Sequence, residues 1–308
     1  MNPKQTIIAV LKAADAVVSG EALSAQLGIS RVSIWKHIKG LVQAGVPIVS
    51  SPKGYRLVPD PDSLLPWGFD ARWDRMHYFP EIDSTMDEAM RLARKGCPDF
   101  TIVVAQRQTR GRGRMQRSWV SDDGGLYFTV VVRPDIPLMR SGVVNLAAAV
   151  DMATLLQSEL GLDAGLKWPN DILVDKKKIC GILTQIEGEG DQVAHMNIGV
   201  GLNVNNSPDI QAPSAVSLKS LLGRKVPRRD ILVAFLDAFE RRLAAFDSAA
   251  AIEAWKSSNV TLGRRVRVAT LKETVAGTAM DLDAHGGLIV QLADGSRRLV
   301  MHGDCFHE

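Results

Sequence analysis

Apolar residues recur at helical spacing near the start of the chain. Ile34, Ile38 and Leu41 fall at i, i+4 and i+7 after Ser30, the spacing of one face of an α-helix. Because serine is a residue type that caps helices, we expect a helix from Ser30 to about Leu41. The other side of this helix then carries four polar residues, Arg31, Ser33, Lys36 and Lys39.

Shorter patterns flank this helix. The sequence predicts a helix over residues 6–17, another over residues 21–27 that ends at Gly28, and a hairpin over residues 48–57. Three helices and a hairpin form a winged helix-turn-helix, whose third helix enters the major groove while the hairpin contacts phosphates. We therefore predict a DNA-binding domain over residues 1–60. Its expected DNA contacts are Arg31, Ser33, Lys36, Lys39, Lys53 and Arg56.

The charge distribution supports this assignment. Residues 1–58 hold seven basic and two acidic side chains, a formal charge of +5, whereas the whole chain carries +3. The rest of the chain is therefore slightly acidic. A basic segment on a nearly neutral body indicates a nucleic-acid backbone as the partner. A winged helix that binds another protein remains the alternative.

A mixture of strands and helices follows Pro59-Asp60-Pro61-Asp62, whose prolines favour an extended linker. The irregular alternation favours an α+β domain over residues 66–258, with a mixed sheet and helices on one side. The expected strands cover residues 76–79, 101–105, 126–132, 166–168, 172–174, 179–187 and 193–204. The expected helices cover residues 86–95, 141–160 and 230–246.

The last part of the chain changes pattern again. Short strands are expected over residues 265–269, 274–281, 288–292 and 297–301, with turns at Gly286-Gly287 and Asp294-Gly295. This pattern predicts a small SH3-like β-barrel over residues 259–308. The fold class is therefore multidomain α+β.

Cysteine and histidine usage argues against a metal site held by the protein. Cys97, Cys180 and Cys305 are odd in number and lack paired spacing, and the six histidines show no ligand spacing. The first helix is amphipathic, so neither a signal peptide nor a membrane span is expected. We predict a cytoplasmic protein.

The segment from Arg107 to Arg117 holds five arginines, two glycines and no acidic residue. Glycine lets the backbone wrap around a ligand, and arginine presents a planar fork to carboxylate or phosphate. We call residues 107–119 the arginine loop. On charge alone, this loop suits either a nucleic acid or a phosphorylated small molecule.

A second segment, Lys167-Trp168-Pro169-Asn170-Asp171, places a cation at the end of an expected strand. A lysine beside Trp-Pro is more often structural, but with the arginine loop it supplies a point charge to one pocket. These two segments and Ile198-Gly199-Val200-Gly201-Leu202-Asn203-Val204 resemble the three hallmark segments of biotin protein ligases. The winged helix resembles the bifunctional subgroup, in which the ligase is also a transcriptional repressor.

The resemblance implies an activity and its partners. Biotin and ATP, the latter accompanied by Mg²⁺, would form biotinyl-5'-AMP. The biotinyl group would then pass to a lysine of the biotin carboxyl carrier domain of acetyl-CoA carboxylase. The protein would also bind operator DNA as a biotin-responsive repressor, as a homodimer in the adenylate-bound form. A biotin-sensing repressor without transfer activity and a lipoate ligase are the alternatives.

The resemblance also assigns the site. Lys167 and Arg114 are expected to be catalytic, because cations offset the repulsion between the carboxylate of biotin and the α-phosphate. ATP is expected to contact Arg117, Trp119 and Asn203. The expected biotin contacts are Ser84, Thr85, Met86, Gln108, Gly111, Arg112, Gly113, Arg114 and Lys167.

Other interpretations of individual residues stay open. Thr85 and Glu88 also fit a capping box, in which Ser84 and Thr85 only cap a helix. The family usually has Asn where Met86 stands and Gly where Gln116 stands, which implies one lost biotin contact and a stiffer loop. Lys176-Lys177-Lys178 is interpreted as a solvated turn between strands.

Overall fold

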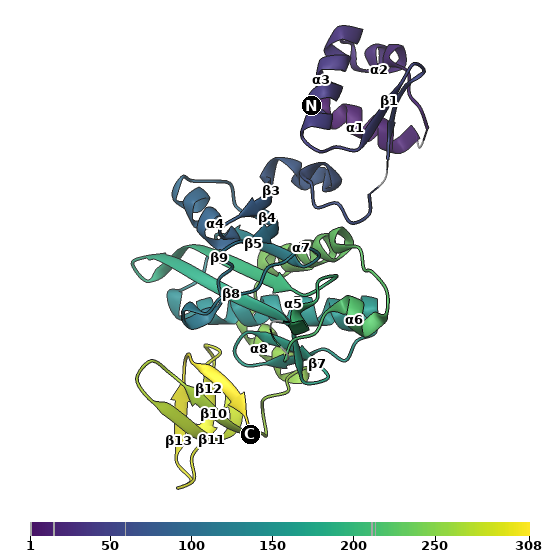
Figure 1. Ribbon diagram of the computed structural model, residues 1–308. Coiled ribbons are helices and arrows are strands. Elements are labelled where there is room, and N and C mark those ends of the chain that lie inside the picture. Colours follow the sequence, from purple (N-terminus) through teal and green to yellow (C-terminus); the bar gives the residue numbers. More distant parts are fainter. Residues whose placement is uncertain (1, 15, 59, 211, 213) are drawn as a thin grey trace. The chain divides into compact units, whose positions relative to one another are not determined.

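The computed structural model of the chain describes residues 2–14, 16–58, 60–210, 212 and 214–308 (Figure 1). The chain forms two compact units, Met1–Asp74 and Arg75–Glu308. Pro59, which belongs to the expected linker, lies outside the described residues.

The first unit holds three helices and a two-stranded antiparallel hairpin: α1 (Pro3–Ala14), α2 (Gly20–Leu27), α3 (Arg31–Gln43), β1 (Ile48–Ser51) and β2 (Gly54–Leu57). Ser30 caps α3 by accepting a hydrogen bond from the Ser33 amide, and Gly28 ends α2 in the left-handed conformation. These predictions are confirmed. α1 lies three residues earlier than predicted, with Pro3 in the first turn, where proline is tolerated.

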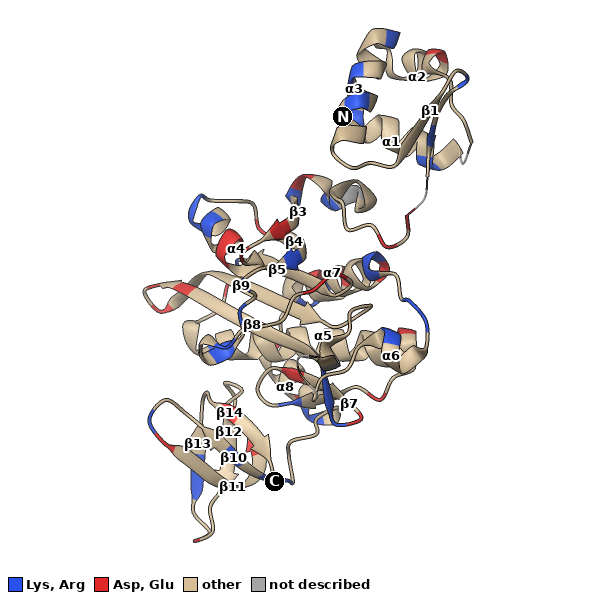
Figure 2. Cartoon of the chain, in the orientation of Figure 1, with Lys and Arg blue, Asp and Glu red and all other residues tan. Residues whose placement is uncertain are grey.

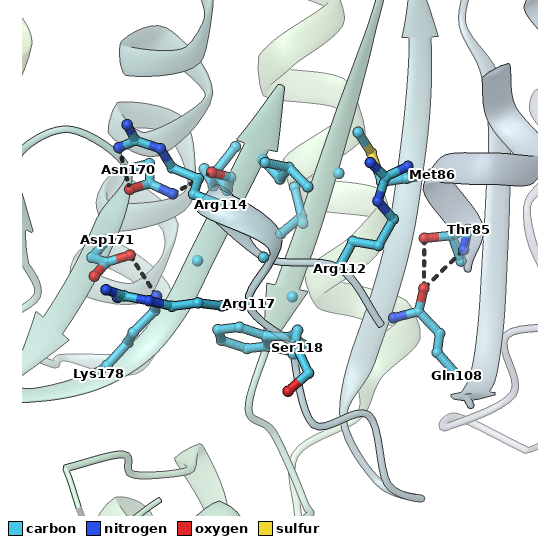
Figure 3. Close-up of a pocket in the computed structure, with 18 of the residues that line it drawn as sticks. Thr85, Met86, Gln108, Arg112, Arg114, Arg117, Ser118, Asn170, Asp171 and Lys178 are labelled. Atoms are coloured by element: carbon cyan, nitrogen blue, oxygen red, sulfur yellow. Dashed lines mark hydrogen bonds and ion pairs between the residues drawn. The ribbon is translucent and has the colours of Figure 1, made fainter. Parts of the chain in front are cut away.

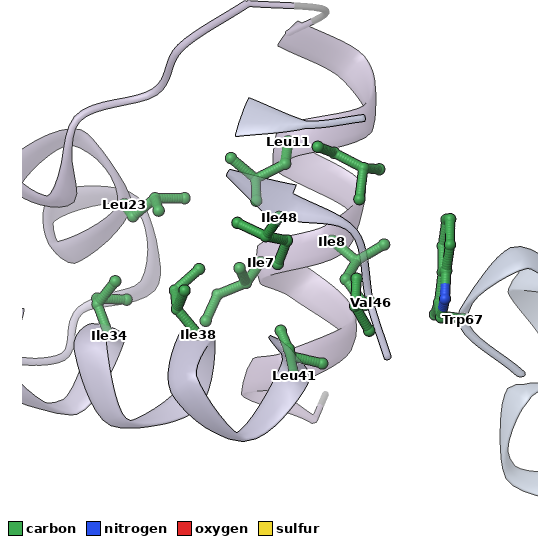
Figure 4. Packing of buried hydrophobic residues seen from close by; sticks show 11 residues of the cluster. Ile7, Ile8, Leu11, Leu23, Ile34, Ile38, Leu41, Val46, Ile48 and Trp67 are labelled. Carbon is green, nitrogen blue, oxygen red and sulfur yellow. The ribbon is translucent and has the colours of Figure 1, made fainter. Parts of the chain in front are cut away.

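The core of this unit lies between the three helices and the hairpin (Figure 4). Ile34, Ile38 and Leu41 are buried on the inner side of α3, as their spacing predicts. They pack with a cluster from the other elements: Ile7, Ile8, Leu11, Leu23, Val46, Ile48, Leu57 and Trp67. Burying each such side chain stabilises the unit by about 1.5–3 kcal/mol, so this core fixes the outward side of α3.

The second unit is built on a seven-stranded sheet in the order β3-β4-β5-β9-β8-β7-β6. Only the β3–β4 pair is parallel, so the sheet is mixed as predicted. The strands are β3 (Met76–Ile82), β4 (Thr101–Gln108), β5 (Leu126–Val132), β6 (Gly165–Lys167), β7 (Asp171–Val174), β8 (Lys177–Glu189) and β9 (Gln192–Leu202).

Helices lie on both faces of this sheet. Phe128 of β5 packs edge to face against Phe235 of α7 (Arg228–Ala244), with ring centroids 5.3 Å apart. The next residue, Thr129, donates a hydrogen bond to Thr85 of α4 (Thr85–Arg94). Neighbouring residues of a strand point to opposite faces, so the prediction of helices on one side is wrong for α4. The reason is the apolar side of α4, whose Ala89 and Ala93 pack on β4 and β5.

The remaining helices of the unit are α5 (Ser141–Leu160), α6 (Leu218–Leu222) and α8 (Ser248–Ser257). Within the described chain, the stretch Leu138–Leu160 is the one helix long and apolar enough to cross a membrane. However, 67% of its apolar window is buried inside the protein, as is usual for a core helix of a globular domain. α5 contacts α7, α8 and the strands β6, β7, β8 and β9.

Five C-terminal strands form an antiparallel sheet in the order β13-β12-β11-β10-β14. They are β10 (Arg265–Ala269), β11 (Thr274–Leu282), β12 (Leu288–Gln291), β13 (Arg297–Val300) and β14 (Asp304–His307). The sequence did not predict β14, whose four residues carry no clear alternation. β13 and β14 are the two ends of the sheet, and the described strands show no pairing between them. The predicted SH3-like barrel is therefore not confirmed; the sheet is open.

Candidate functional site

One pocket of the second unit collects side chains from segments far apart in the sequence (Figure 3). It lies on the face of the large sheet that also carries α4. Its walls come from the start of α4, the arginine loop, the turn after β6, and the strands β8, β9 and β14. The lining residues are Thr85, Met86, Gln108, Arg112, Gly113, Arg114, Arg117, Ser118, Trp119, Asn170, Asp171, Lys178, Gly181, Ile182, Leu183, Gly199, Val200, Gly201 and Asp304.

The floor of the pocket is bare backbone. Gly181 and Gly201 face each other in the register of β8 and β9, and the ring of Trp119 lies on both. A β-carbon at position 201 would lie 2.5 Å from Cε2 of Trp119, and one at position 199 would lie 2.5 Å from Sδ of Met86. Neither contact is sterically possible, so the glycines create the space that these two side chains occupy.

Each arginine of the wall is held by a partner from another element. Arg112 pairs with Asp87 of α4, and Arg117 pairs with Asp304 of β14. Arg114 donates a hydrogen bond to Oδ1 of Asn170 over 3.3 Å. Burial lowers the pKa of Arg114, while the charges of Asp304 and Asp171 raise it. The guanidinium stays charged at neutral pH, in surroundings that strengthen its attraction to anions.

A chain of hydrogen bonds closes the other end of the pocket. Thr129 donates to Thr85 Oγ1 over 2.9 Å, and Thr85 donates both its amide and its hydroxyl to Oε1 of Gln108. The amide group of Gln108 in turn donates to Ser121 Oγ. Gln108, not a side chain of the helix, therefore satisfies the first amide of α4.

This arrangement decides between two interpretations of the α4 start. Ser84 is the N-cap residue, but its side chain makes no capping hydrogen bond, and its buried hydroxyl has no hydrogen-bond partner among the described residues. Glu88 pairs with Arg91 instead of accepting from the Thr85 amide, which donates to Gln108. The capping-box interpretation is therefore wrong.

The tip of the arginine loop is strained. Met115 and Gln116 both have positive φ, at 50° and 60°, a region that costs a residue with a β-carbon about 1 kcal/mol relative to glycine. Gly111 is required for a different reason, because a β-carbon there would lie 2.3 Å from the carbonyl oxygen of Trp119. The loop is thus folded tightly at its base and strained at its tip.

The first unit presents a separate cationic surface. Five of the six residues expected to contact DNA are exposed on α3 and the hairpin (Figure 2): Arg31, Lys36, Lys39, Lys53 and Arg56. Ser33 is only half exposed, and its hydroxyl lies 3.0 Å from that of Ser30. Trp35 stands among these cations with 51% of its surface exposed, and Nζ of Lys39 lies 5.2 Å from its ring centroid.

Comparison with known proteins agrees with this geometry. Residues 78–203 match the Biotin/lipoate A/B protein ligase family, residues 4–56 match an HTH domain, and residues 261–308 match the Biotin protein ligase C terminal domain. The Bifunctional ligase/repressor BirA of Bacillus spizizenii is 35% identical over 297 residues, covering 92% of this chain and 91% of that protein. The chain belongs to the bifunctional biotin protein ligase family.

Two further biotin protein ligases extend the comparison. The Bifunctional ligase/repressor BirA of Bacillus subtilis is 34% identical over 303 residues, covering 94% of this chain and 93% of that protein. The biotin protein ligase from Aquifex aeolicus in complex with biotin and ATP superposes with a TM-score of 0.63 at 27% identity. That match covers 76% of this chain and 98% of the Aquifex chain.

The structure brings most of the expected ligand contacts of this ligase together. Thr85, Met86, Gln108, Gly113 and the three arginines line the pocket, and so does Trp119. Four expected residues lie elsewhere. Ser84 is buried, Gly111 is buried and lines a second cavity beside the arginine loop, and Asn203 is buried with its side chain accepting a hydrogen bond from Asn206. Lys167 lines a different cavity, together with Arg264 and His307.

The placement of Lys167 follows from the strand that carries it. Lys167 is the last residue of β6, the edge strand of the sheet, and lies opposite Asp171 of β7 in the strand register. The next residue, Trp168, is almost fully buried. The indole of Trp168 donates to the carbonyl oxygen of Gly286, which fixes this edge against the C-terminal sheet. The role of Lys167 in this ligase stays a prediction.

Eleven lining residues were not among the expected contacts, and four of these carry an amide or charged side chain: Asn170, Asp171, Lys178 and Asp304. Asn170 and Asp171 belong to the segment quoted for Lys167, so the motif itself contained that signal. Lys178 was assigned to a solvated turn. Lys176 and Lys177 are exposed there, but Lys178 is half-buried and lines the pocket, so that interpretation is wrong for Lys178.

Proposed function

We propose that this chain joins biotin and ATP into biotinyl-5'-AMP and transfers the biotinyl group to a lysine of a biotin carboxyl carrier domain, that of acetyl-CoA carboxylase. The observation that carries the proposal is the meeting of three distant segments, residues 111–119, 167–171 and 198–204, around one pocket. Its relatives are named as bifunctional ligase/repressors, and the Aquifex neighbour holds biotin and ATP, which supports the same substrates here.

The first step, formation of the adenylate, requires positive charge near the reacting groups. The carboxylate oxygen of biotin forms a bond to the α-phosphorus, and pyrophosphate leaves with the electron pair of the broken P–O bond. Two anions must approach each other, so fixed positive charge lowers the barrier. Arg112 and Arg114 supply this charge from a loop whose base is rigid. We assign Arg114 to the phosphoryl oxygens, because it is the more buried of the two.

The second step needs position more than side-chain chemistry. The unprotonated amine of the carrier lysine attacks the acyl carbon, an amide forms as the nitrogen loses one proton to water, and AMP leaves with the electron pair of the broken acyl–oxygen bond. No nucleophile of the enzyme takes part, so the pocket acts by orientation and by excluding water from the mixed anhydride. We propose that the hydrogen-bonded Thr85 and Gln108 and the apolar Met86 hold the biotin end, while Arg117 and Trp119 hold the nucleotide.

Mg²⁺ forms part of this proposal. Asp171 and Asp304 are the two carboxylates that line the pocket, and the described residues contain no cluster of three potential metal ligands. This donor set fits Mg²⁺ that arrives with ATP, since Mg²⁺ is usually held by one or two carboxylates, phosphate oxygens and water. Asp171 and Asp304 would hold the ion, which would neutralise phosphate charge.

We propose that the first unit binds operator DNA and so represses transcription. Its exposed cations on α3 and the hairpin suit operator DNA, and the HTH match supports the same role. We further propose that the protein acts in the cytoplasm, binds its operator as a homodimer in the adenylate-bound form, and divides into domains at residues 1–60, 66–258 and 259–308, the last being SH3-like.

Release of pyrophosphate in the presence of biotin tests the first step. The wild-type protein is expected to release pyrophosphate only when biotin and ATP are both present. Replacing biotin by lipoate should abolish the release, and the opposite preference would establish a lipoate ligase. Lys167→Ala is expected to cut the rate of pyrophosphate release severely. A near-normal rate would contradict the expected catalytic role of Lys167 and would agree with its position in the other cavity.

A further inference from the structure

Lys178 reaches the pocket because of an irregularity in its strand. β7 and β8 are joined at Asp175 and Lys176, which both have positive φ as a two-residue hairpin turn requires. The pairing then shifts, with Ile172 opposite Cys180 but Leu173 opposite Lys178, so Ile179 is an extra residue. Strict alternation would place Lys178 and Gly181 on opposite faces of the sheet. The bulge instead turns Lys178 onto the face of Gly181.

The side chain of Lys178 lies across the floor of the pocket. A β-carbon at Gly181 would lie 3.1 Å from both Cε and Nζ of Lys178, and the Trp119 ring occupies the neighbouring space. Nζ lies 2.6 Å from Oδ1 of Asp171 and 5.1 Å from the centroid of the Trp119 ring. The ammonium thus sits between the acid of one hallmark segment and the aromatic ring of another; Figure 3 shows its contact with Asp171.

These contacts set Lys178 apart from the lysines around it. Lys176 and Lys177 are exposed at the turn, and Lys167 lines the other cavity. Among the lysines of the described chain, Lys178 is the one that lines the pocket. Its acidic partner Asp171 also raises the pKa of Arg114, after Asp304, so the two carboxylates of the pocket lie near the three cations Arg114, Arg117 and Lys178.

We propose that Lys178 binds the polyphosphate of ATP and stabilises the pyrophosphate that leaves when the adenylate forms. This inference rests on the proposed function. When biotin's carboxylate attacks the α-phosphorus, the electron pair of the broken bond goes to the bridging oxygen of pyrophosphate. Lys178 exchanges its pair with Asp171 for one with this oxygen and its neighbours. It transfers no proton and acts by charge alone.

The two steps of the reaction should respond differently to loss of the Lys178 charge. Pyrophosphate is absent from the second step, in which the carrier lysine displaces AMP, so loss of the Lys178 charge should leave that step nearly unchanged. A purely structural lysine that only supports the floor or Asp171 would affect both steps together. The comparison therefore uses biotin with ATP in one reaction and supplied biotinyl-5'-AMP in the other, with the same full-length protein and carrier domain.

Lys178→Met keeps an apolar stem on Gly181 and Trp119 while removing the charge. We expect biotin-dependent ATP–pyrophosphate exchange to fall roughly 100-fold, and transfer from supplied biotinyl-5'-AMP to stay within about threefold of wild type. Lys178→Arg, which keeps the charge, should recover most of the exchange rate. Lys177→Ala, on the exposed side of the same turn, is the matched control and should match wild type.

Exchange that falls less than about tenfold, or an equal loss in both reactions, would overturn the role of Lys178. Failure of the proposed function looks different, because wild-type protein would then show no biotin-dependent exchange at all. Thermal unfolding of each variant shows whether it is folded; if Lys178→Met is not, Lys178→Gln, which also removes the charge, is compared in the same two reactions with the same expected outcomes.

Discussion

The cationic side chains of the two units differ in whether they are paired with acidic residues. On the outward surface of the first unit, Arg31, Lys36, Lys53 and Arg56 have no ion pair with an acid among the described residues. In the pocket of the second unit, Arg112, Arg117 and Lys178 each contact an aspartate from another element. Cations without an acidic partner can bind the many phosphates along a nucleic acid. A cation that is paired with an aspartate must instead give up that contact when it binds the phosphate of a small ligand.

The largest expected effect comes from removing a half-buried charge of the pocket. Arg114→Ala should lower biotin-dependent ATP–pyrophosphate exchange by roughly 10²- to 10³-fold, because its charge stabilises the phosphoryl oxygens in the transition state. Arg110→Ala is the matched control: Arg110 lies in the same loop, but its side chain is 82% exposed and pairs only weakly with Asp83. Similar losses in both variants would mean that total loop charge matters, as in the first unit.

The exposed cations of the first unit should respond differently. Replacing Arg31, Lys36 and Lys53 together by alanine should weaken DNA binding roughly 100-fold and lower the slope of log affinity against log salt by about 3. Adenylate formation should stay at the wild-type rate. An unchanged salt slope in a filter-binding titration would show that these side chains do not contact phosphates, and would leave a protein partner as the role of the winged helix.

A smaller effect is expected in the cavity that Lys167 lines, where the charges of Lys167 and Arg264 act on His307. Burial, with help from the charges of Lys167 and Arg264, lowers the pKa of His307 to about 4. The folded protein therefore keeps this ring neutral where the unfolded chain is protonated, so stability is lost as pH falls from about 6.5 to about 4. Because His307 is only half-buried, we expect a loss of roughly 1 kcal/mol.

His307→Gln should remove this pH dependence, which chemical denaturation at pH 7 and pH 4.5 measures. Lys167→Met should raise the pKa of His307 in an NMR titration, since one nearby positive charge is lost. An unchanged His307 pKa in Lys167→Met would place the Lys167 charge away from this cavity and closer to the ligand pocket, contrary to the structure.

The smallest effect should come from the strained tip of the arginine loop. Gln116→Gly should stabilise the folded protein by up to about 1 kcal/mol, because glycine adopts positive φ without steric cost. Gln116→Ala keeps a β-carbon and should give no gain. A thermal unfolding scan that shows equal midpoints for both variants would mean that the strain at residue 116 is negligible.

Local pattern was enough to predict much of this molecule. The helix that begins after Ser30, the core residues Ile34 and Ile38, and nearly all strands of the large sheet follow from periodicity and capping. The arginine loop and the segment from Lys167 to Asp171 were recognisable because their composition is unusual. Signals of this kind lie within a few residues of each other along the chain.

The remaining features depend on contacts between distant segments. Asp304 comes from a strand of four residues and enters the pocket only because β14 is placed against the arginine loop, where Arg117 holds it. Lys178 faces the pocket because of one extra residue in β8, which no alternation of apolar and polar residues could indicate. The register places Lys167 opposite Asp171 on the same face of the sheet, but β6 is the edge strand, and Lys167 lines the neighbouring cavity with Arg264 and His307.

The central claim is that the pocket makes an acyl-adenylate and passes its acyl group to a carrier. The most direct measurement is the intact mass of a biotin carboxyl carrier domain after incubation with the wild-type protein, biotin and ATP. The account predicts a mass increase of one biotinyl group on a single lysine, which is absent when ATP is omitted and forms roughly 10²- to 10³-fold more slowly when Arg114 is replaced by alanine. An unmodified carrier, although the protein binds biotin and DNA, would contradict the account and establish a sensor without transfer activity.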